Sequence, residues 1–528
     1  MYLVKFFTSF YYKIIFIIHN KKNFKFIKKK TKKKILVEIN NFYPSMIVLP
    51  YLLFALQKFH KAKLVGYLPS FDSSLRNLLV RCLIIFFPLS RFSIYKSFGV
   101  NNILNNKLTN RNLVNLANKI YKQIIKIKST NYFLKFKYQK VLIGDLIYDS
   151  YLRSKAKHTA DIRSREFQEF VFQQILIFAY WKNIFKKNKI SAVVLSHEVY
   201  SLAFPLRLAA SQNISSYIAT LTSINLFNNK RYYSLDSKVF NQNFLNLNMK
   251  QKKNYLDFSK KKIKEKFNSK SEFYDEFSKI DVLSKSIKKN KFIFSNKIKS
   301  KNNILKNKKK NIIIFSHCFY DAPHVVKHLF ADFYDWLDFL GKVSNQTDYN
   351  WFIKTHPHTL NPKLSKIVFD NLLEKYPKFN ILDKNSSAKE ILANSDLILT
   401  IYGSAAYEFA YFKKKVVLAS PYSHYKNYNF CLQPKNKQEY FNIIKNFDKI
   451  NIKFDRKEIY QFYFNSVLSF FNPFNLLSER KNLKKDFFKT RIFNSLIDKF
   501  DARKHFLYLK CVDEFVKSKK FRLTQLPN

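Results

Sequence analysis

The sequence predicts an α/β protein with two Rossmann-like domains, a helical linker between them and further helices at the C-terminus. Short apolar runs alternate with longer segments of helical period, a pattern typical of parallel sheets wrapped by helices. The chain has 528 residues, too many for one hydrophobic core. A lysine-rich stretch interrupts the alternation near the middle, so we expect one sheet on each side of it.

The predicted domains follow one another along the chain. Residues 1–34 form a basic leader that could lie on a membrane surface, and residues 35–240 form the N-terminal domain. The lysine-rich linker spans residues 241–310. Residues 311–455 form the C-terminal domain, and residues 456–528 form the C-terminal helices.

Each domain is expected to contain apolar strands joined by helices, among them a helix near 44–59 and another near 325–343. The sequence contains no Gly-x-Gly-x-x-Gly, so the fingerprint of a dinucleotide-binding domain is absent. The predicted strands are 35–39, 63–68, 191–196 and 215–220 in the first domain, and 311–317, 350–354, 379–383, 396–401 and 415–420 in the second.

The formal net charge of +59 would ordinarily indicate nucleic acid or an anionic membrane as a partner. Lysine, asparagine, isoleucine and aromatic residues are all abundant while glycine is scarce, the bias of an AT-rich coding sequence, so we discount part of this charge. The lysines are dispersed instead of forming one stripe interleaved with aromatic residues, and we expect no specific nucleic-acid binding. The four cysteines show no disulfide framework and no metal-ligand spacing, which favours a reducing, cytoplasmic setting without a bound metal.

The first twenty residues are apolar and aromatic but carry Lys5 and Lys13, and a lysine-rich segment follows. A spanning helix needs about 20 residues with few charges, and a secretory signal needs a small-residue cleavage site. We therefore expect neither. Two interpretations stay open, an amphipathic segment on the inner face of a membrane and a disordered basic leader.

The first candidate binding residues are Lys354 and His356, because ligands of open α/β sheets bind beyond the carboxyl ends of the strands. Strand 350–354 ends at Lys354, and Pro357 keeps His356 in an extended conformation. The two side chains project to the same side of the chain and could both donate to one phosphate. Alternatively, they are a surface lysine and a loop histidine.

Gly403 and Ser404 follow strand 396–401 and open a helix. The glycine permits a tight turn, and the amides at a helix N-terminus suit an anion. Glu408 lies one helical turn further and could accept hydrogen bonds from a ribose. The alternative is that Ser404 only caps the helix and Glu408 only favours its dipole. His317 and Asp321, after the first strand of this domain, could overhang the same edge or be ordinary loop residues.

Several segments resemble the donor-domain motifs of bacterial capsule and surface-polysaccharide biosynthesis proteins, which are glycosyltransferase-like and have the two-domain GT-B architecture. They are "IFSHCFYDAPH", "FADFYDWL", "WFIKTHPHTLNP" and "LTIYGSAAYEFAYFKKKVVL". In the N-terminal half, "VLIGDLIYDSYLR" and "VVLSHEVYSLAFPLRLAA" are also similar. The resemblance covers roughly residues 35–420.

The resemblance implies that the two Rossmann-like domains face a central cleft. Across this cleft a sugar would pass from a nucleotide-activated donor to a growing capsule, lipopolysaccharide or other surface glycan, without a cofactor or a bound metal. The acceptor would be a glycan or a lipid-linked glycan. By the same resemblance Lys354 and His356 would hold the donor phosphate, Ser404 and its neighbouring amides would cradle it, and Glu408 would take the ribose.

An acceptor hydroxyl also needs a general base. The candidates are His197 and Glu198, which follow strand 191–196, and Asp145. His197 could instead be a strand-end histidine bonded to the backbone, and Asp145 could be only a helix cap. Asp149 and Arg153, four residues apart, are expected to form an ordinary ion pair on one helix.

Two other functions stay open. A nucleotide-sugar 2-epimerase has the same two-domain layout and likewise uses a His-Pro loop and a Ser/Glu helix start, so resemblance in fold cannot exclude it. A basic nucleic-acid-binding protein would explain the charge, but we find no recognition module in the sequence.

Overall fold

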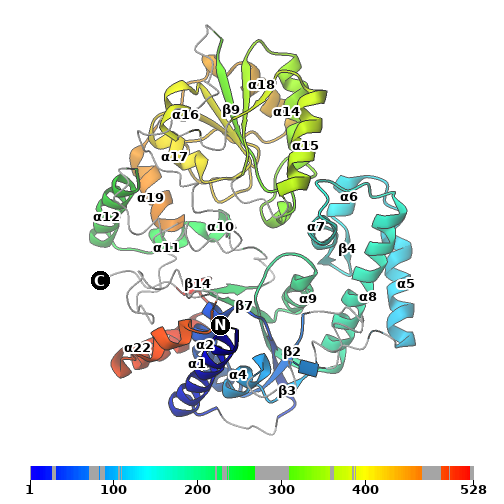
Figure 1. The fold of residues 1–528 in the computed structure, drawn as a ribbon, viewed down its shortest axis with the longest axis vertical. Coiled ribbons are helices and arrows are strands. Elements are labelled where there is room, and N and C mark those ends of the chain that lie inside the picture. The colour runs from blue at the N-terminus through cyan, green and yellow to red at the C-terminus, as the bar shows by residue number, and fades with distance from the viewer. Residues whose placement is uncertain are drawn as a thin grey trace.

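The computed structural model shows two α/β units, drawn one above the other in Figure 1. They are called the N-terminal unit and the C-terminal unit below. The structure describes residues 2–26, 31–69, 82–83, 90–104, 108, 110–220, 223–228, 233, 235, 237–267, 309–356, 362–382, 386, 388–452, 454–466, 489–498 and 500–523.

The N-terminal unit is built on a sheet of seven strands in the order β14-β8-β7-β6-β1-β2-β3. The strands from β7 to β3 pair in parallel, whereas β8 pairs antiparallel with both β7 and β14. The bounds are β1 Lys33–Glu38, β2 Lys63–Tyr67, β3 Asn102–Ile103, β6 Lys189–Leu195, β7 Ser215–Ala219, β8 Ile224–Phe227 and β14 Arg522–Leu523. A small antiparallel hairpin of β4 Lys137–Tyr138 and β5 Val141–Leu142 lies outside this sheet.

The C-terminal unit contains a five-stranded sheet in the order β11-β10-β9-β12-β13, in which all neighbours are parallel. Its strands read as nearly continuous apolar runs because helices cover both faces of the sheet. The bounds are β9 Asn311–Phe315, β10 Asn350–Lys354, β11 Phe379–Ile381, β12 Leu397–Thr400 and β13 Lys415–Leu418.

Helices cover both sheets. In the N-terminal unit they are α1 Tyr2–Asn23, α2 Tyr43–His60, α4 Arg91–Ser97, α5 Arg111–Ile124, α6 Thr130–Leu134, α7 Gly144–Lys155, α8 Arg165–Lys187, α9 Phe204–Ser211, α21 Ile492–Ile497 and α22 Ala502–Ser518, with a 3₁₀ turn at Ser201–Ala203. In the C-terminal unit they are α10 Ser237–Phe240, α11 Gln242–Leu245, α12 Met249–Phe267, α14 Phe333–Asn345, α15 Pro362–Lys375, α16 Ala388–Asn394, α17 Ala405–Tyr411, α18 Lys437–Lys445 and α19 Arg456–Ser466, with 3₁₀ turns at Pro323–Val325 and Phe447–Lys449.

The predicted fold class, two Rossmann-like α/β units, is confirmed. One boundary differs in a way that matters for the site. The helix expected near 325–343 begins only at Phe333, because the side chain of Asp332 accepts a hydrogen bond from the amide of Asp335 (2.8 Å) and caps the helix. The segment between β9 and α14 is therefore a long loop.

The first part of the expected linker packs within the C-terminal unit. α12 lies against α19 (Figure 1), and Tyr255, Ile263 and Phe267 are buried in the same cluster as strand and helix residues of that unit. Residues 268–308 lie outside the described part of the chain.

The expected leader is a helix packed into the N-terminal unit. In α1, Phe16 is fully buried and stacks on Phe493 of α21 with ring centroids 4.0 Å apart. Asn20 donates a hydrogen bond to the hydroxyl of Ser97 in α4. In the residues that the structure describes, no helix combines the length and the apolar character that a membrane span needs.

The C-terminal segment returns to the N-terminal unit. β14 extends the first sheet by pairing with β8, and α22 packs on α2. The hydroxyl of Tyr51 in α2 lies 2.9 Å from Nδ1 of His505 in α22. α22 and β14 therefore belong to the same unit as α1.

Candidate functional site

The carboxyl edge of the C-terminal sheet gathers the loops that the sequence singled out. The amide of His356, after β10, donates to the hydroxyl of Ser316, after β9 (3.1 Å). The amide of Ser316 in turn donates to the carbonyl of Lys354 (3.1 Å). These two hydrogen bonds hold the ends of adjacent strands together.

His317 lies at the centre of this edge. Its Nε2 is 3.3 Å from Oγ1 of Thr400, at the end of β12, and its ring stacks on Phe333 with centroids 4.7 Å apart. Burial of the ring, followed by the charge of nearby His356, lowers the pKa of His317 to about 3. His317 is therefore a neutral imidazole at neutral pH, with the imidazole of His356 close to it.

Gly403 brings the turn after β12 close to His317. A Cβ atom at this position would lie 2.9 Å from Oγ1 of Thr400 and 3.7 Å from Cε1 of His317, so a side chain would push the turn away. Ser404 follows, exposed, and α17 begins directly after it. The amide of Ala406 donates to the carbonyl of Gly403 (3.1 Å), whereas the amides of Ser404 and Ala405 have no acceptor within the helix.

Lys354 reaches in another direction. Its Nζ lies 3.5 Å from the carbonyl of Ser386, in the loop after β11. The edge thus carries donors after β9, β10 and β12, with the ammonium group of Lys354 on the β11 side and the imidazole of His356 beside His317.

Glu408 is not brought to this group. Its carboxylate accepts a hydrogen bond from Lys266 of α12 (2.5 Å), and the two side chains are 8% and 6% exposed. Lys266 also donates to the hydroxyl of Tyr407 (2.6 Å). The expected ribose contact is therefore not supported by this geometry, because the carboxylate is buried against another helix.

The carboxyl edge of the N-terminal sheet holds a relay that ends in His197. Glu38, the last residue of β1, accepts hydrogen bonds from the amide of Ser196 (3.0 Å) and from its hydroxyl (2.5 Å). The hydroxyl oxygen of Ser196 lies 2.6 Å from Nδ1 of His197. Glu38 is buried while His197 is exposed, so the relay runs from the interior to the surface.

The relay defines the tautomer of His197. Ser196 has one hydroxyl hydrogen, which is directed to Glu38, so the serine oxygen accepts from Nδ1–H of His197. Nε2 is then the basic nitrogen. Burial raises the pKa of Glu38, and the two hydrogen bonds from Ser196 oppose this by favouring the carboxylate. The sequence analysis did not identify Glu38, although a carboxylate at the end of an apolar strand could have indicated a polar site there.

The other two candidate bases have different surroundings. Glu198 lies near the buried guanidinium of Arg522 in β14; burial lowers the pKa of that arginine to about 10, and the charge of Glu198 opposes the shift. Asp145 is buried in α7 and accepts hydrogen bonds from Arg207 (2.9 Å) and from the hydroxyl of Tyr233 (2.5 Å). Asp145 as a general base is therefore not supported, because its carboxylate is engaged in a buried ion pair.

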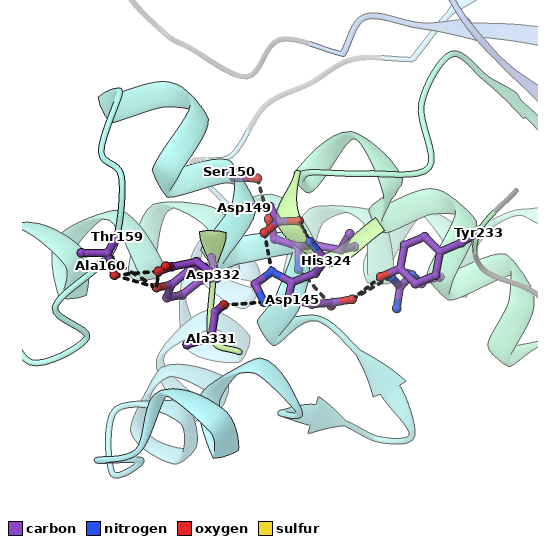
Figure 2. A network of polar contacts seen from close by, with 12 residues as sticks. Asp145, Asp149, Ser150, Thr159, Ala160, Tyr233, His324, Ala331 and Asp332 are labelled. Atoms are coloured by element: carbon purple, nitrogen blue, oxygen red, sulfur yellow. Dashed lines mark hydrogen bonds and ion pairs between the residues drawn. The ribbon is translucent and has the colours of Figure 1, made fainter. Parts of the chain in front are cut away.

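α7 also carries the main polar contact between the two units (Figure 2). The carboxylate of Asp149 accepts a hydrogen bond from the backbone amide of His324 (3.2 Å). Its other oxygen lies 2.5 Å from Nδ1 of the His324 ring. Nε2 of His324 lies 2.8 Å from the carbonyl of Ala331. Both ring nitrogens face acceptors, which indicates an imidazolium. Burial alone would lower the pKa of His324, but Asp149 and neighbouring carboxylates outweigh burial and raise it.

A second contact joins α7 to the cap of α14 (Figure 2). Asp332 accepts hydrogen bonds from the hydroxyls of Tyr148 (2.7 Å) and Thr159 (2.6 Å). Burial raises the pKa of Asp332, and these hydrogen bonds oppose the rise. The residue that ends the long loop after β9 is thereby also attached to the N-terminal unit.

Asp321 lies between the units as well. It accepts a hydrogen bond from the hydroxyl of Tyr200 (3.0 Å), and its carboxylate is 3.7 Å from the guanidinium of Arg153. The expected helix pair of Asp149 and Arg153 is therefore wrong, because each residue pairs with the C-terminal unit. The expected role of Asp321 in nucleotide binding stays a prediction.

A column of stacked rings connects the contact between the units to the carboxyl edge of the C-terminal sheet. This edge is called the donor edge below, after its hydrogen-bond donors. The rings of His324 and His328 stack with centroids 5.7 Å apart, and His328 stacks on Phe333 at 5.8 Å. Phe333 is the ring on which His317 stacks. Sequence reasoning missed His324 and His328, whose roles depend on long-range pairing.

Within the described residues, no group of three or more His, Cys, Asp or Glu side chains is arranged to hold a metal ion. Metal independence of the reaction stays a prediction.

No protein-family model and no curated protein matches the sequence. Solved structures do resemble the chain, among them KpsC of Thermosulfurimonas dismutans, a β-Kdo 2,4 transferase (11% identity over 55% of this chain and 88% of that chain, TM-score 0.31). A second is the UDP-GlcNAc 2-epimerase of Methanocaldococcus jannaschii, solved with UDP-GlcNAc and UDP (10% identity, 82% and 98%, TM-score 0.26).

A third is a glycosyltransferase of Rickettsia africae (12% identity, 93% and 100%, TM-score 0.23). These identities and scores are too low to transfer a substrate or a residue role to this chain. Of these three structures, two are glycosyltransferases and one is a nucleotide-sugar 2-epimerase.

Proposed function

We propose that this protein is a glycosyltransferase that moves a sugar from a nucleotide-activated donor to a hydroxyl group of a surface glycan. One observation carries the proposal: the carboxyl edges of the two sheets meet. Tyr200, three residues after His197, hydrogen-bonds to Asp321, four residues after His317. A nitrogen-rich edge and a carboxylate–hydroxyl–imidazole relay therefore belong to loops that touch.

The C-terminal edge supplies the donor side. Transfer breaks the bond between the sugar and the phosphate oxygen, so negative charge grows on the leaving nucleotide. His356 and the amides at Ser404 can meet this charge, and Lys354 can join them by turning away from the carbonyl of Ser386, each donor contributing about 3 kcal/mol when well placed. His317 supports the geometry, because it stays neutral and positions the turn at Gly403.

The N-terminal edge supplies the acceptor side. As the acceptor oxygen bonds to the sugar carbon, its proton passes to Nε2 of His197, and the imidazolium is stabilised through Ser196 by the carboxylate of Glu38. The nucleotide leaves with the electron pair of the broken bond. A general base of this kind contributes about 10²–10⁴-fold to the rate.

The proposal is tested by incubating the purified chain with nucleotide sugars of uridine, guanosine and cytidine, with and without a capsule or lipopolysaccharide acceptor. We expect release of nucleotide that depends on the acceptor and incorporation of the sugar into it. Interconversion of the free nucleotide sugar without acceptor would instead identify an epimerase. A response to none of these donors, in binding or turnover, would overturn the proposal.

Contact with the inner face of a membrane and a cytoplasmic location stay predictions.

A further inference from the structure

A cavity of about 220 Å³ lies in the N-terminal unit, between α1, α4 and the start of α2. Its polar lining consists of Lys13, Asn41, Tyr43, Ser90 and Arg91. Neither the donor edge nor the His197 relay contains any of these residues. The cavity is too small for a whole nucleotide sugar, since sites for ligands of that size measure about 300–1,000 Å³.

The lining of the cavity includes two cations, and among the residues that the structure describes it includes no carboxylate. Lys13 and Arg91 form no ion pair with any residue that the structure describes. Burial and the charge of Arg91 lower the pKa of Lys13. The groups that interact electrostatically with Arg91 include the phenols of Tyr43 and Tyr95, which are neutral at neutral pH. Two partly buried cations that repel each other cost stability unless an anion joins them.

Two polar groups at the cavity have no partner. Ser90 is only 8% exposed and its hydroxyl makes no hydrogen bond, although it occupies the position that normally caps a helix. Nε of Arg91 is also buried without an acceptor. Buried donors without acceptors are rare in folded proteins and indicate a missing group. An anionic oxygen in the cavity would satisfy both.

The cavity lies next to the relay. The hydroxyl of Tyr95, in α4, accepts a hydrogen bond from the amide of Asn40 (3.2 Å), two residues after Glu38. The same tyrosine interacts electrostatically with both Glu38 and Arg91. The cavity and the relay therefore share the carboxyl end of β1.

We propose that this cavity binds one anionic group, a phosphate or a sugar carboxylate, carried by the acceptor. This role of the ligand rests on the proposed function, whereas binding of the anion itself does not. Lys13 and Arg91 supply the charge, and Ser90 supplies a neutral donor. The bound group would anchor the acceptor beside His197.

The test is a thermal-shift titration with inorganic phosphate against sodium chloride at equal ionic strength. It is carried out in the wild type and in His356→Ala, so that phosphate bound at the donor edge is separated from phosphate in the cavity. We expect a saturable rise in midpoint that persists in His356→Ala and is lost in Arg91→Gln and Lys13→Gln. Lys21→Gln in α1 and Lys96→Gln in α4 remove an exposed charge from the same helices and should keep the response.

The unliganded variants give a second readout. Removing either cation relieves the repulsion, so Arg91→Gln should unfold at the same midpoint as the wild type or higher, whereas a merely structural arginine would lower it. Glycerol 1-phosphate and glucuronate, titrated in parallel, identify phosphate or carboxylate as the group. The proposal fails if none of the three anions exceeds the chloride control, or if Arg91→Gln keeps the full response. If the wild type binds no nucleotide but still responds to the anion, the proposed function is overturned and the anion site stands.

Discussion

The carboxyl edge of the C-terminal sheet is rich in nitrogen donors, whereas the carboxyl edge of the N-terminal sheet is built around a buried carboxylate. The first places two imidazoles, an ammonium group and a helix start around a glycine turn. The second places Glu38 behind Ser196 and leaves His197 exposed. Both edges are formed by the carboxyl ends of parallel strands, and they differ in the residues that follow these strands.

The difference indicates a division of labour. A row of donors can hold a phosphate, and among the described residues only the charge of His356 acts on His317, so no carboxylate there stabilises a proton on that imidazole. The Glu38 relay can accept a proton but offers no array of donors to an anion. Each edge therefore supplies the half of a transfer reaction that the other lacks, and substitutions should separate rate from nucleotide affinity.

The largest expected effect is on the relay. His197→Ala should lower kcat by about 10²–10⁴-fold, because the acceptor proton loses its base. The dissociation constant of the nucleotide, measured by calorimetry, should not change. Glu38→Gln should lower kcat less, since it keeps the imidazole but weakens its support. A weaker nucleotide affinity in His197→Ala would contradict the division.

The next effect concerns the contact that holds the edges together. Asp149→Ala should lower the free energy of unfolding by about 3–5 kcal/mol, because it leaves His324 buried without its partner. Chemical denaturation followed by circular dichroism measures the loss. An unchanged unfolding curve would show that the buried pair does not stabilise the docked units.

The same pair predicts a pH dependence. The pKa of His324 is raised above its ordinary value of 6.5, so its contribution is complete below about pH 6.5 and is lost as the pH rises through the raised value. Burial raises the pKa of Asp149, which makes stability fall with rising pH in a lower window as well. The difference in stability between wild type and Asp149→Ala should therefore shrink as the pH rises above about 6.5 and through the raised pKa of His324. A constant difference would contradict the charged pair.

A smaller effect is expected at the donor edge. His356→Ala and Lys354→Ala should each weaken nucleotide binding by about 10–100-fold, the value of a hydrogen bond to a charged group, without unfolding the unit. Lys363→Ala, in the exposed first turn of α15, is the matched control and should bind normally. Equal nucleotide affinities in all three variants would contradict nucleotide binding at this edge.

The smallest effect is at the exposed contact between the units. Asp321→Asn removes the partner of Arg153, but both side chains are well exposed, so the loss in stability should be about 1 kcal/mol or less. Comparing this variant with Asp149→Ala in the same denaturation experiment shows whether burial decides the strength of the contact. A loss as large as that of Asp149→Ala would contradict this explanation.

The sequence predicted the scaffold well because apolar periodicity is local. The strands end close to where the apolar runs end. For this reason the sequence alone predicts that His317, Lys354, His356 and Gly403 lie at one edge of the sheet. The start of α14 was predicted too early because the cap at Asp332 is not distinguishable in sequence from other aspartates of that segment.

The pairings of charged residues could not be predicted in the same way. Asp149 and Arg153 have ideal helical spacing, yet each finds its partner in the other unit. Glu408 has ideal spacing from Ser404, yet it pairs with Lys266 of α12. A buried carboxylate pairs with the cation that tertiary packing places next to it. The spacing of residues along one helix does not determine which cation that is.

A crystal structure of the chain with a bound nucleoside diphosphate tests the central claim most directly. The account predicts a phosphate oxygen within hydrogen-bond distance of the imidazole of His356 and of the backbone amide of Ser404. A diphosphate bound elsewhere, for instance at the buried Arg207, with His356 and Ser404 untouched, would contradict it.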